Sequence, residues 1–136
     1  MKTPEEAKGK IIEQWLAKAD ADLAAAKLFI SEERSFYYIV AFLTQQAAEK
    51  YIKAYLTWHE IDFPKTHDID LLLDLAATKD LNLAESLRPA YILSDYAVDF
   101  RYPGDFPDPT KSEAQEAISL AEKVRDEILR EVRKEK

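Results

Sequence analysis

The chain has 136 residues, with 19 Lys plus Arg against 26 Asp plus Glu, 2 Gly and no Cys. This length is typical of one domain with one hydrophobic core, so we take residues 1–136 as a single domain. The lack of cysteine excludes disulfide frameworks, thiolate metal sites and cysteine nucleophiles. Two glycines are too few for a glycine-rich phosphate-binding loop, so we expect any bound anion to be held by side chains. The composition favours an all-α protein.

The charge and hydropathy of the chain narrow the classes of function further. A formal net charge of −7 argues against a protein that coats nucleic acid, although it is compatible with a local basic site. No apolar run approaches the ~18 residues of a membrane span, and the first residues contain no apolar signal core. We therefore expect no membrane segment and a cytoplasmic location.

Two long helices are predicted in the first half of the chain. Ile12, Leu16 and Leu23 belong to a series of apolar residues spaced by three and four positions, which predicts a helix over 10–30. After a polar interruption, Ser35 is a suitable N-cap for a second helix over 36–58. The two helices have similar lengths and are expected to pair as an antiparallel hairpin.

Shorter elements follow in the second half. Pro64 ends the helical pattern, and Thr66 is expected to cap a short third helix. The pattern pauses at 79–82, and a fourth helix is expected from near Ser86 to about 98, because Pro89 is tolerated only in a first turn. A proline-rich loop over 101–109 precedes the last helix, which opens with a capping box of Thr110 and Glu113. The predicted fold is all-α: an up-and-down four-helix bundle of about five helices with an interrupted third element.

The second helix is apolar on two sides. We expect its core stripe to consist of Phe36, Val40, Leu43, Ala47, Tyr51, Ala54 and Trp58. The opposite side carries Tyr38, Phe42, Ile52 and Leu56 beside Gln45 and Glu49. A helix that is apolar on two sides usually has neighbours on both, so we predict that a second copy of the chain covers this face in a homodimer. The alternative is that these are ordinary surface aromatics covered by a longer connecting loop.

Polar residues of the same helix are candidates for anion binding. Lys50 and Lys53 offer ammonium groups, and Gln46 adds an amide one turn before Lys50. The alternative is a solvated helix edge on which Glu49 and Lys53 form an i,i+4 ion pair worth a few tenths of a kcal/mol.

Three further residues have two interpretations each. His67 stands near a helix start, where it either bonds a carbonyl or carboxylate and fixes the turn, or contacts a ligand or partner. Arg101 either forms an ion pair with nearby aspartates or binds phosphate. Tyr102 either stacks on a base or packs at the bundle edge. The two histidines and their acidic neighbours have poor spacing for a metal site, so no metal ligand and no cofactor are assigned.

Four segments, taken in order, resemble the HEPN domain family (higher eukaryotes and prokaryotes nucleotide-binding domain) in its small stand-alone prokaryotic form. They are Trp15 to Leu23 with Ala19-Asp20 and Asp22-Leu23; Gln45-Gln46-Ala47-Ala48-Glu49-Lys50 with Lys53-Ala54; Pro64 through His67-Asp68-Ile69 with Leu72; and Tyr96 through Arg101-Tyr102-Pro103. The resemblance implies a helical bundle that commonly dimerises and is often encoded beside a minimal nucleotidyltransferase, as in toxin-antitoxin pairs. It also makes the matching polar residues candidates for ligand binding: Gln46, Glu49, Lys50, Lys53, His67, Arg101 and Tyr102.

Many members of this family are metal-independent ribonucleases with an Arg and a His about four to six residues apart. In this chain no His follows Arg101 at that distance, so the usual proton-transfer group is missing and no catalytic residue is assigned. The resemblance thus implies a module that binds a nucleotide or another phosphate-bearing ligand, including RNA, or partners a nucleotidyltransferase, or both. The alternatives are a ribonuclease that uses His67, from elsewhere in the fold or from a second chain, and a dimeric scaffold without a ligand.

Overall fold

The protein is all-α in a computed structural model that describes residues 3–32, 36–96 and 108–133. The elements are α1 (Pro4–Ile30), α2 (Tyr37–Trp58), α3 (Ile69–Ala77), α4 (Leu81–Leu87), the 3-10 helix η1 (Arg88–Tyr96) and α5 (Lys111–Val132). The described residues form no strand, and no helix among them has both the length and the hydrophobicity needed to cross a bilayer. The predicted fold class is therefore confirmed.

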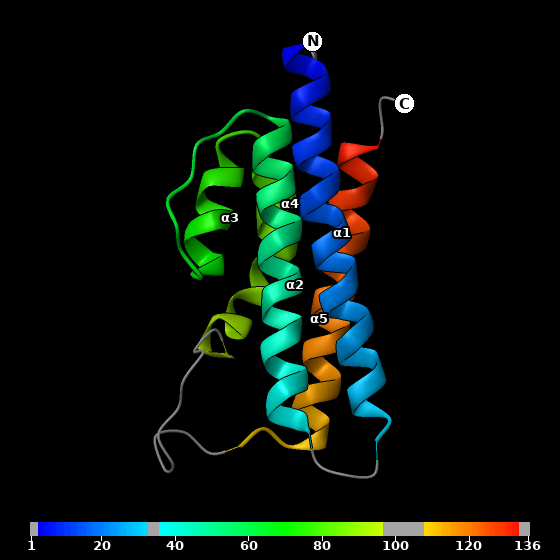
Figure 1. The fold of residues 1–136 in the computed structure, drawn as a ribbon. Helices are drawn as coiled ribbons and strands as arrows, with labels where there is room; N and C mark the ends of the chain where they lie inside the picture. Colours follow the sequence, from blue (N-terminus) through cyan, green and yellow to red (C-terminus); the bar gives the residue numbers. More distant parts are fainter. Residues whose placement is uncertain (1–2, 33–35, 97–107, 134–136) are drawn as a thin grey trace.

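The three long helices stand side by side, and α1 runs opposite to α2 and α5 (Figure 1). The chain then returns along the side of α2 and rises through α3. It descends again through α4 and η1, which form the third element of the bundle (Figure 1). The sequence predicted an interrupted third element made of two short helices, whereas here the interruption lies between α4 and η1, and α3 is an additional helix packed against α2 and α4.

Local capping fixes where the helices begin. The Thr3 hydroxyl accepts a hydrogen bond from the Glu6 amide, and Pro4 occupies the first turn, so α1 begins earlier than the apolar pattern indicated. At α5, Thr110 and Glu113 form the predicted capping box, in which each side chain bonds the backbone amide of the other.

The predicted boundaries of α3 and α4 were wrong by several residues. Asp68, and not Thr66, caps α3 by accepting from the Leu71 amide. Asp80 caps α4 by accepting from the Leu83 amide, so a helix begins where the pattern seemed to pause. Pro89 lacks an amide hydrogen and lies in the first turn of η1, where the α-helix gives way to 3-10 geometry. The predicted end near 98 lies outside the described residues.

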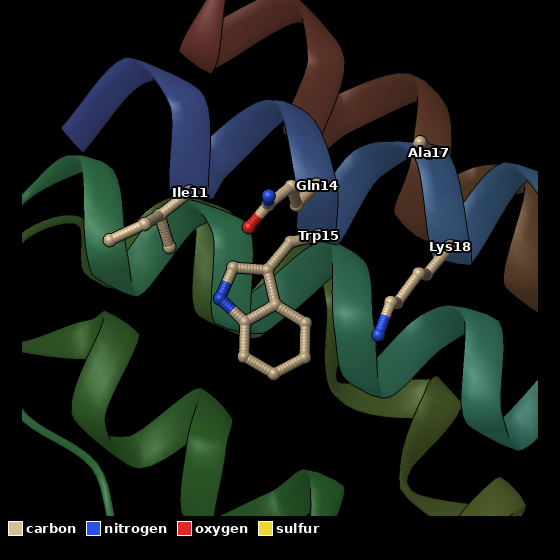
Figure 2. Close-up of a pocket in the computed structure, with 5 residues that line it drawn as sticks. All are labelled: Ile11, Gln14, Trp15, Ala17 and Lys18. Carbon is tan, nitrogen blue, oxygen red and sulfur yellow. The ribbon is translucent and has the colours of Figure 1, made fainter. Parts of the chain in front are cut away.

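Helix α2 occupies the centre of the domain and contacts α1, α3, α5 and η1. Of its predicted core stripe, Val40, Ala47, Tyr51 and Ala54 are fully buried, whereas Phe36, Leu43 and Trp58 are half-buried. On the side facing α1, the half-buried indole ring of Trp15 lies over the α2 ribbon (Figure 2).

The second apolar face of α2 is already covered within the domain at Ile52 and Leu56. Both side chains are 0% exposed and belong to the same core cluster as Ile69 and Leu72 of α3. The prediction that a second copy covers this part of the face was wrong, because the segment after α2 folds back and brings α3 onto it. A homodimer itself remains a prediction, now without Ile52 and Leu56 as its reason.

Candidate functional site

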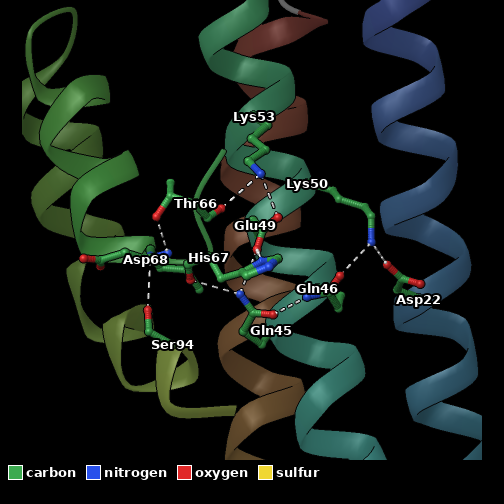
Figure 3. Close-up of polar contacts among 11 residues, drawn as sticks. Asp22, Gln45, Gln46, Glu49, Lys50, Lys53, Thr66, His67, Asp68 and Ser94 are labelled. Atoms are coloured by element: carbon green, nitrogen blue, oxygen red, sulfur yellow. Dashed lines mark hydrogen bonds and ion pairs between the residues drawn. The ribbon is translucent and has the colours of Figure 1, made fainter. Parts of the chain in front are cut away.

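Polar side chains of α2 converge with residues of α1 and of the 59–68 segment, which connects α2 to α3 (Figure 3). Gln45, Glu49 and Lys53 are buried, with exposed fractions of 0%, 4% and 7%, so this part of α2 is not the solvated edge considered as an alternative. We call this group the α2 polar cluster; its members are Asp22, Gln45, Gln46, Glu49, Lys50, Lys53 and His67.

The Glu49 carboxylate is the centre of the cluster. Its Oε1 accepts from Gln45 Nε2 at 3.0 Å and contacts His67 Nδ1 at 2.7 Å, while Oε2 accepts from Lys53 Nζ at 2.8 Å. Burial raises the pKa of this carboxyl, but the hydrogen bonds from Lys53, His67 and Gln45 together outweigh burial, and the pKa lies below its ordinary value. Glu49 is therefore ionised at neutral pH and acts only as an acceptor.

This carboxylate fixes the orientation of the His67 ring. Because Glu49 can only accept, Nδ1 must carry a hydrogen, and in the neutral ring Nε2 is then left with a free lone pair. The His67 side chain is 55% exposed, although the carboxylate that holds it is only 5% exposed. The interpretation that His67 bonds a carboxylate is confirmed by this contact, which uses only the Nδ1 atom of the ring.

Lys53 fastens the 59–68 segment to α2. Its ammonium donates to Glu49 and, at 3.1 Å, to the carbonyl of Thr66. It also lies 5.7 Å from the ring centre of Trp15 and 5.8 Å from that of Phe63. The predicted ion pair with Glu49 exists, but it is buried instead of solvated, and protein groups surround the ammonium.

Lys50 lies nearer to solvent and joins α2 to α1. Its ammonium is 2.6 Å from Asp22 Oδ2 and 3.3 Å from Gln46 Oε1, and the side chains of the Lys50–Asp22 pair are 18% and 23% exposed. The Gln46 amide in turn donates to Gln45 Oε1 at 2.6 Å. A chain of polar contacts thus runs from α1 to the 59–68 segment.

The structure brings together five of the seven predicted ligand-binding residues: Gln46, Glu49, Lys50, Lys53 and His67. The other two, Arg101 and Tyr102, lie outside the described residues. Sequence reasoning missed Asp22 and Gln45 as members of the site. The contact of Asp22 with Lys50 joins separate helices and leaves no local spacing signal, whereas the i,i+4 spacing of Gln45 and Glu49 on α2 was a signal that could have found Gln45. In the described part of the chain, no group of three or more His, Asp or Glu residues is arranged to hold a metal ion.

Comparison with known families bears directly on this arrangement. The family model described as "HEPN domain" matches residues 12–132 of the chain. The chain belongs to the HEPN domain family. The matched range contains the whole α2 polar cluster and extends through α5 of this HEPN domain. No curated protein and no solved structure matches the sequence.

Proposed function

We propose that this HEPN domain is a binding module that holds a phosphate-bearing ligand, a nucleotide or an RNA, at the solvent edge of the α2 polar cluster. The observation that carries the proposal is the His67 ring, fixed by buried Glu49 yet 55% exposed. Its Nε2 accepts from a ribose hydroxyl when the ring is neutral and donates to phosphate when the ring is protonated. Such a fixed polar group avoids much of the entropy that a mobile side chain loses on binding.

Lys50 supplies positive charge to this proposed site. Its ammonium is held by Asp22 in an ion pair that is partly open to solvent. A phosphate group therefore competes with the Asp22 carboxylate for the same ammonium. Gln46 contributes an amide beside Lys50. Glu49 and Lys53 are assigned as positioning residues, since both are buried and act through His67 and the 59–68 segment.

The sequence adds two residues to the proposed site. Arg101 is added as a phosphate contact because of the family resemblance, and Tyr102 as a base contact because its ring can stack. Both lie outside the described residues, so their roles rest on the sequence alone. The domain is further proposed to act in the cytoplasm.

Because the phosphate and the Asp22 carboxylate compete for the Lys50 ammonium, the proposal predicts variants that weaken ligand binding and one that strengthens it. Calorimetry with ATP, GTP and a short RNA is expected to show weaker binding for His67→Ala and Lys50→Gln, and tighter binding for Asp22→Asn. Lys27→Gln is the matched control, because Lys27 also pairs with a carboxylate, Glu122, at 2.7 Å but lies outside the cluster. No binding of any of the three ligands, or equal binding by all four variants, would contradict the proposal.

A second candidate function is RNA cleavage without a metal, with His67 as the base. It is favoured by the Glu49 contact, which leaves Nε2 unprotonated in the neutral ring and able to accept the proton of an attacking ribose hydroxyl. Arg101 would neutralise the phosphate. RNA cleavage in the presence of a chelator should be lost in both His67→Ala and Arg101→Ala. Equal rates for these variants and the wild type would identify a contaminating nuclease.

The proposed partners are a minimal nucleotidyltransferase, as in a toxin-antitoxin pair, and a second copy of the chain. Family membership supports the second copy, since HEPN domains often dimerise, and the nucleotidyltransferase is proposed from the resemblance alone. Light scattering measures the mass of the free protein, and a pull-down against a nucleotidyltransferase encoded by a neighbouring gene tests the heterologous pair. If the protein is a ligand-free scaffold instead, Lys50→Gln and Arg101→Ala will change the stability of the fold, and neither variant will change the binding of any ligand.

A further inference from the structure

We infer that Trp15 is a stacking platform for an unpaired purine base of the ligand, with Lys18 as the adjacent phosphate contact. This inference rests on the proposed function, and it adds a base subsite on α1 to the α2 polar cluster. It starts from a pocket of about 460 Å³ lined by Ile11, Gln14, Trp15, Ala17 and Lys18. A volume of this size is in the range of small-molecule sites.

The indole ring provides the flat surface of this pocket. Figure 2 shows the ring of Trp15 face-on between Ile11 and Lys18, with the α2 ribbon behind it. Trp15 is only partly buried, although it packs against the core cluster. Phe63 packs against the indole, with ring centres 6.4 Å apart and ring planes tilted by 59°. The platform is thus held in place and still accessible.

The Lys53 ammonium favours an electron-rich ring on this platform. Its Nζ lies 5.7 Å from the Trp15 ring centre and is itself held by Glu49 and by the Thr66 carbonyl. A fixed cation over an aromatic ring draws π-electron density towards itself. Stacking of a second, electron-rich ring is then strengthened, and a bicyclic purine covers more of the bicyclic indole than a pyrimidine does.

Lys18 connects the platform to the α2 polar cluster. Trp15, Lys18 and Asp22 follow one another at spacings of three and four on α1, so they share one face of the helix. Asp22 binds Lys50. Lys18 is exposed and has no ion-pair partner in the part of the chain that the structure describes. The phosphate backbone of a nucleic-acid strand whose base stacks on Trp15 therefore passes the Lys18 ammonium before it reaches Lys50.

The amide of Gln14 completes the pocket with hydrogen-bonding groups beside the indole. An amide side chain can donate to and accept from the edge of a base. A paired base presents neither a free face nor a free Watson–Crick edge. The ligand class that fits the pocket is therefore a single-stranded, purine-containing nucleotide or oligonucleotide, and not a duplex.

The experiment uses the full chain with Trp15 as its own reporter. Trp58→Phe leaves Trp15 as the single tryptophan, and its fluorescence is titrated with 5′-phosphorylated oligo(rA), oligo(rU) and the rA–rU duplex, with calorimetry in parallel. Oligo(rA) should quench Trp15 and bind several-fold tighter than oligo(rU) or the duplex. Trp15→Ala should weaken oligo(rA) binding roughly 5- to 100-fold, and Trp15→Phe should restore part of it.

Lys18→Gln covers the case in which Trp15→Ala fails to fold, because Lys18 is an exposed surface residue. It should weaken oligo(rA) binding and reduce the slope of log K against log salt by about 0.7, the contribution of one phosphate contact on a single strand. If oligo(rA) binds but does not quench Trp15 fluorescence, and neither Lys18→Gln nor a folded Trp15→Ala variant weakens binding, the platform is refuted while the proposed function stands. If binding depends on Trp15 but not on His67 or Lys50, the proposed function fails at the cluster and the platform stands. Absence of oligo(rA) binding refutes both.

Discussion

Replacement of Glu49 should destabilise this domain far more than replacement of an exposed glutamate. Glu49→Ala removes the acceptor of three hydrogen bonds and leaves the Lys53 ammonium buried at 7% exposure without its carboxylate. Loss of one partner of a buried ion pair costs about 3–5 kcal/mol, a large share of the roughly 5–15 kcal/mol that holds a domain folded. We expect a loss of this size in the free energy of unfolding.

The chain contains a matched control for this measurement. Glu122 pairs with Lys27 at 2.7 Å, close to the 2.8 Å of the Glu49–Lys53 pair, but its side chain is 41% exposed. Glu122→Ala should therefore cost less than about 1 kcal/mol. Both variants are measured by urea denaturation followed by circular dichroism, with Glu49→Gln as a milder variant if Glu49→Ala does not fold.

A double-mutant cycle separates the pair from its surroundings. Replacement of both partners by apolar residues, Glu49→Leu with Lys53→Met, removes both buried charges at once and should cost clearly less than the sum of the two single changes. Equal costs for Glu49→Ala and Glu122→Ala, or strict additivity in the Glu49 and Lys53 cycle, would refute the view that burial sets the strength of this interaction.

Three further predictions concern pH and capping. The pKa of Glu49 is lower in the folded than in the unfolded state, so its contribution to stability is present above pH ~4.5 and is lost as the pH falls further. The free energy of unfolding of Glu49→Gln should therefore depend less on pH in the acid range than that of the wild type. An unchanged dependence would contradict this. Burial raises the pKa of Tyr55 to about 12, so the contribution of this phenol to stability is present below pH ~10 and is lost as the pH rises towards 12. In denaturant titrations the free energy of unfolding of Tyr55→Phe should therefore fall less over this pH range than that of the wild type. An equally steep fall would count against the argument. Thr110→Ala removes the capping box of α5 and should lower the free energy of unfolding by about 0.5–2 kcal/mol, a change that Thr110→Ser should largely avoid.

Local signals in the sequence were sufficient for much of the fold. The capping box of Thr110 and Glu113 depends on residues three positions apart, and both of its hydrogen bonds form as predicted. The spacing of apolar residues likewise located the three long helices. The boundary at Asp80 was missed because Asp at an N-cap is weaker as a sequence signal than the proline that follows it, Pro89.

The candidate site could be predicted only in part. Glu49, Lys50, Lys53 and His67 were identified from the sequence as ligand-binding candidates, but the burial of Glu49 and Lys53 was not. The position of α3 over Ile52 and Leu56 decides which groups of α2 are buried, and this depends on how the 59–68 segment folds back. The partner of Lys50 is Asp22, 28 positions away on another helix, and no periodicity within one helix encodes such a contact.

The hydrogen bonds that hold the 59–68 segment against α2 bear on how the sequence encodes this region. Lys53 and Gln45 bind the segment through the backbone carbonyls of Thr66 and His67. Every amino acid carries such a carbonyl, so these two bonds do not depend on which side chains stand at 66 and 67. Only the bond from the His67 ring to Glu49 depends on the side chain at 67, and a replacement there keeps the two backbone bonds and loses this third one. The chemistry presented at this edge of the domain is thus encoded at position 67, whereas two of the bonds that hold the segment in place are encoded on α2.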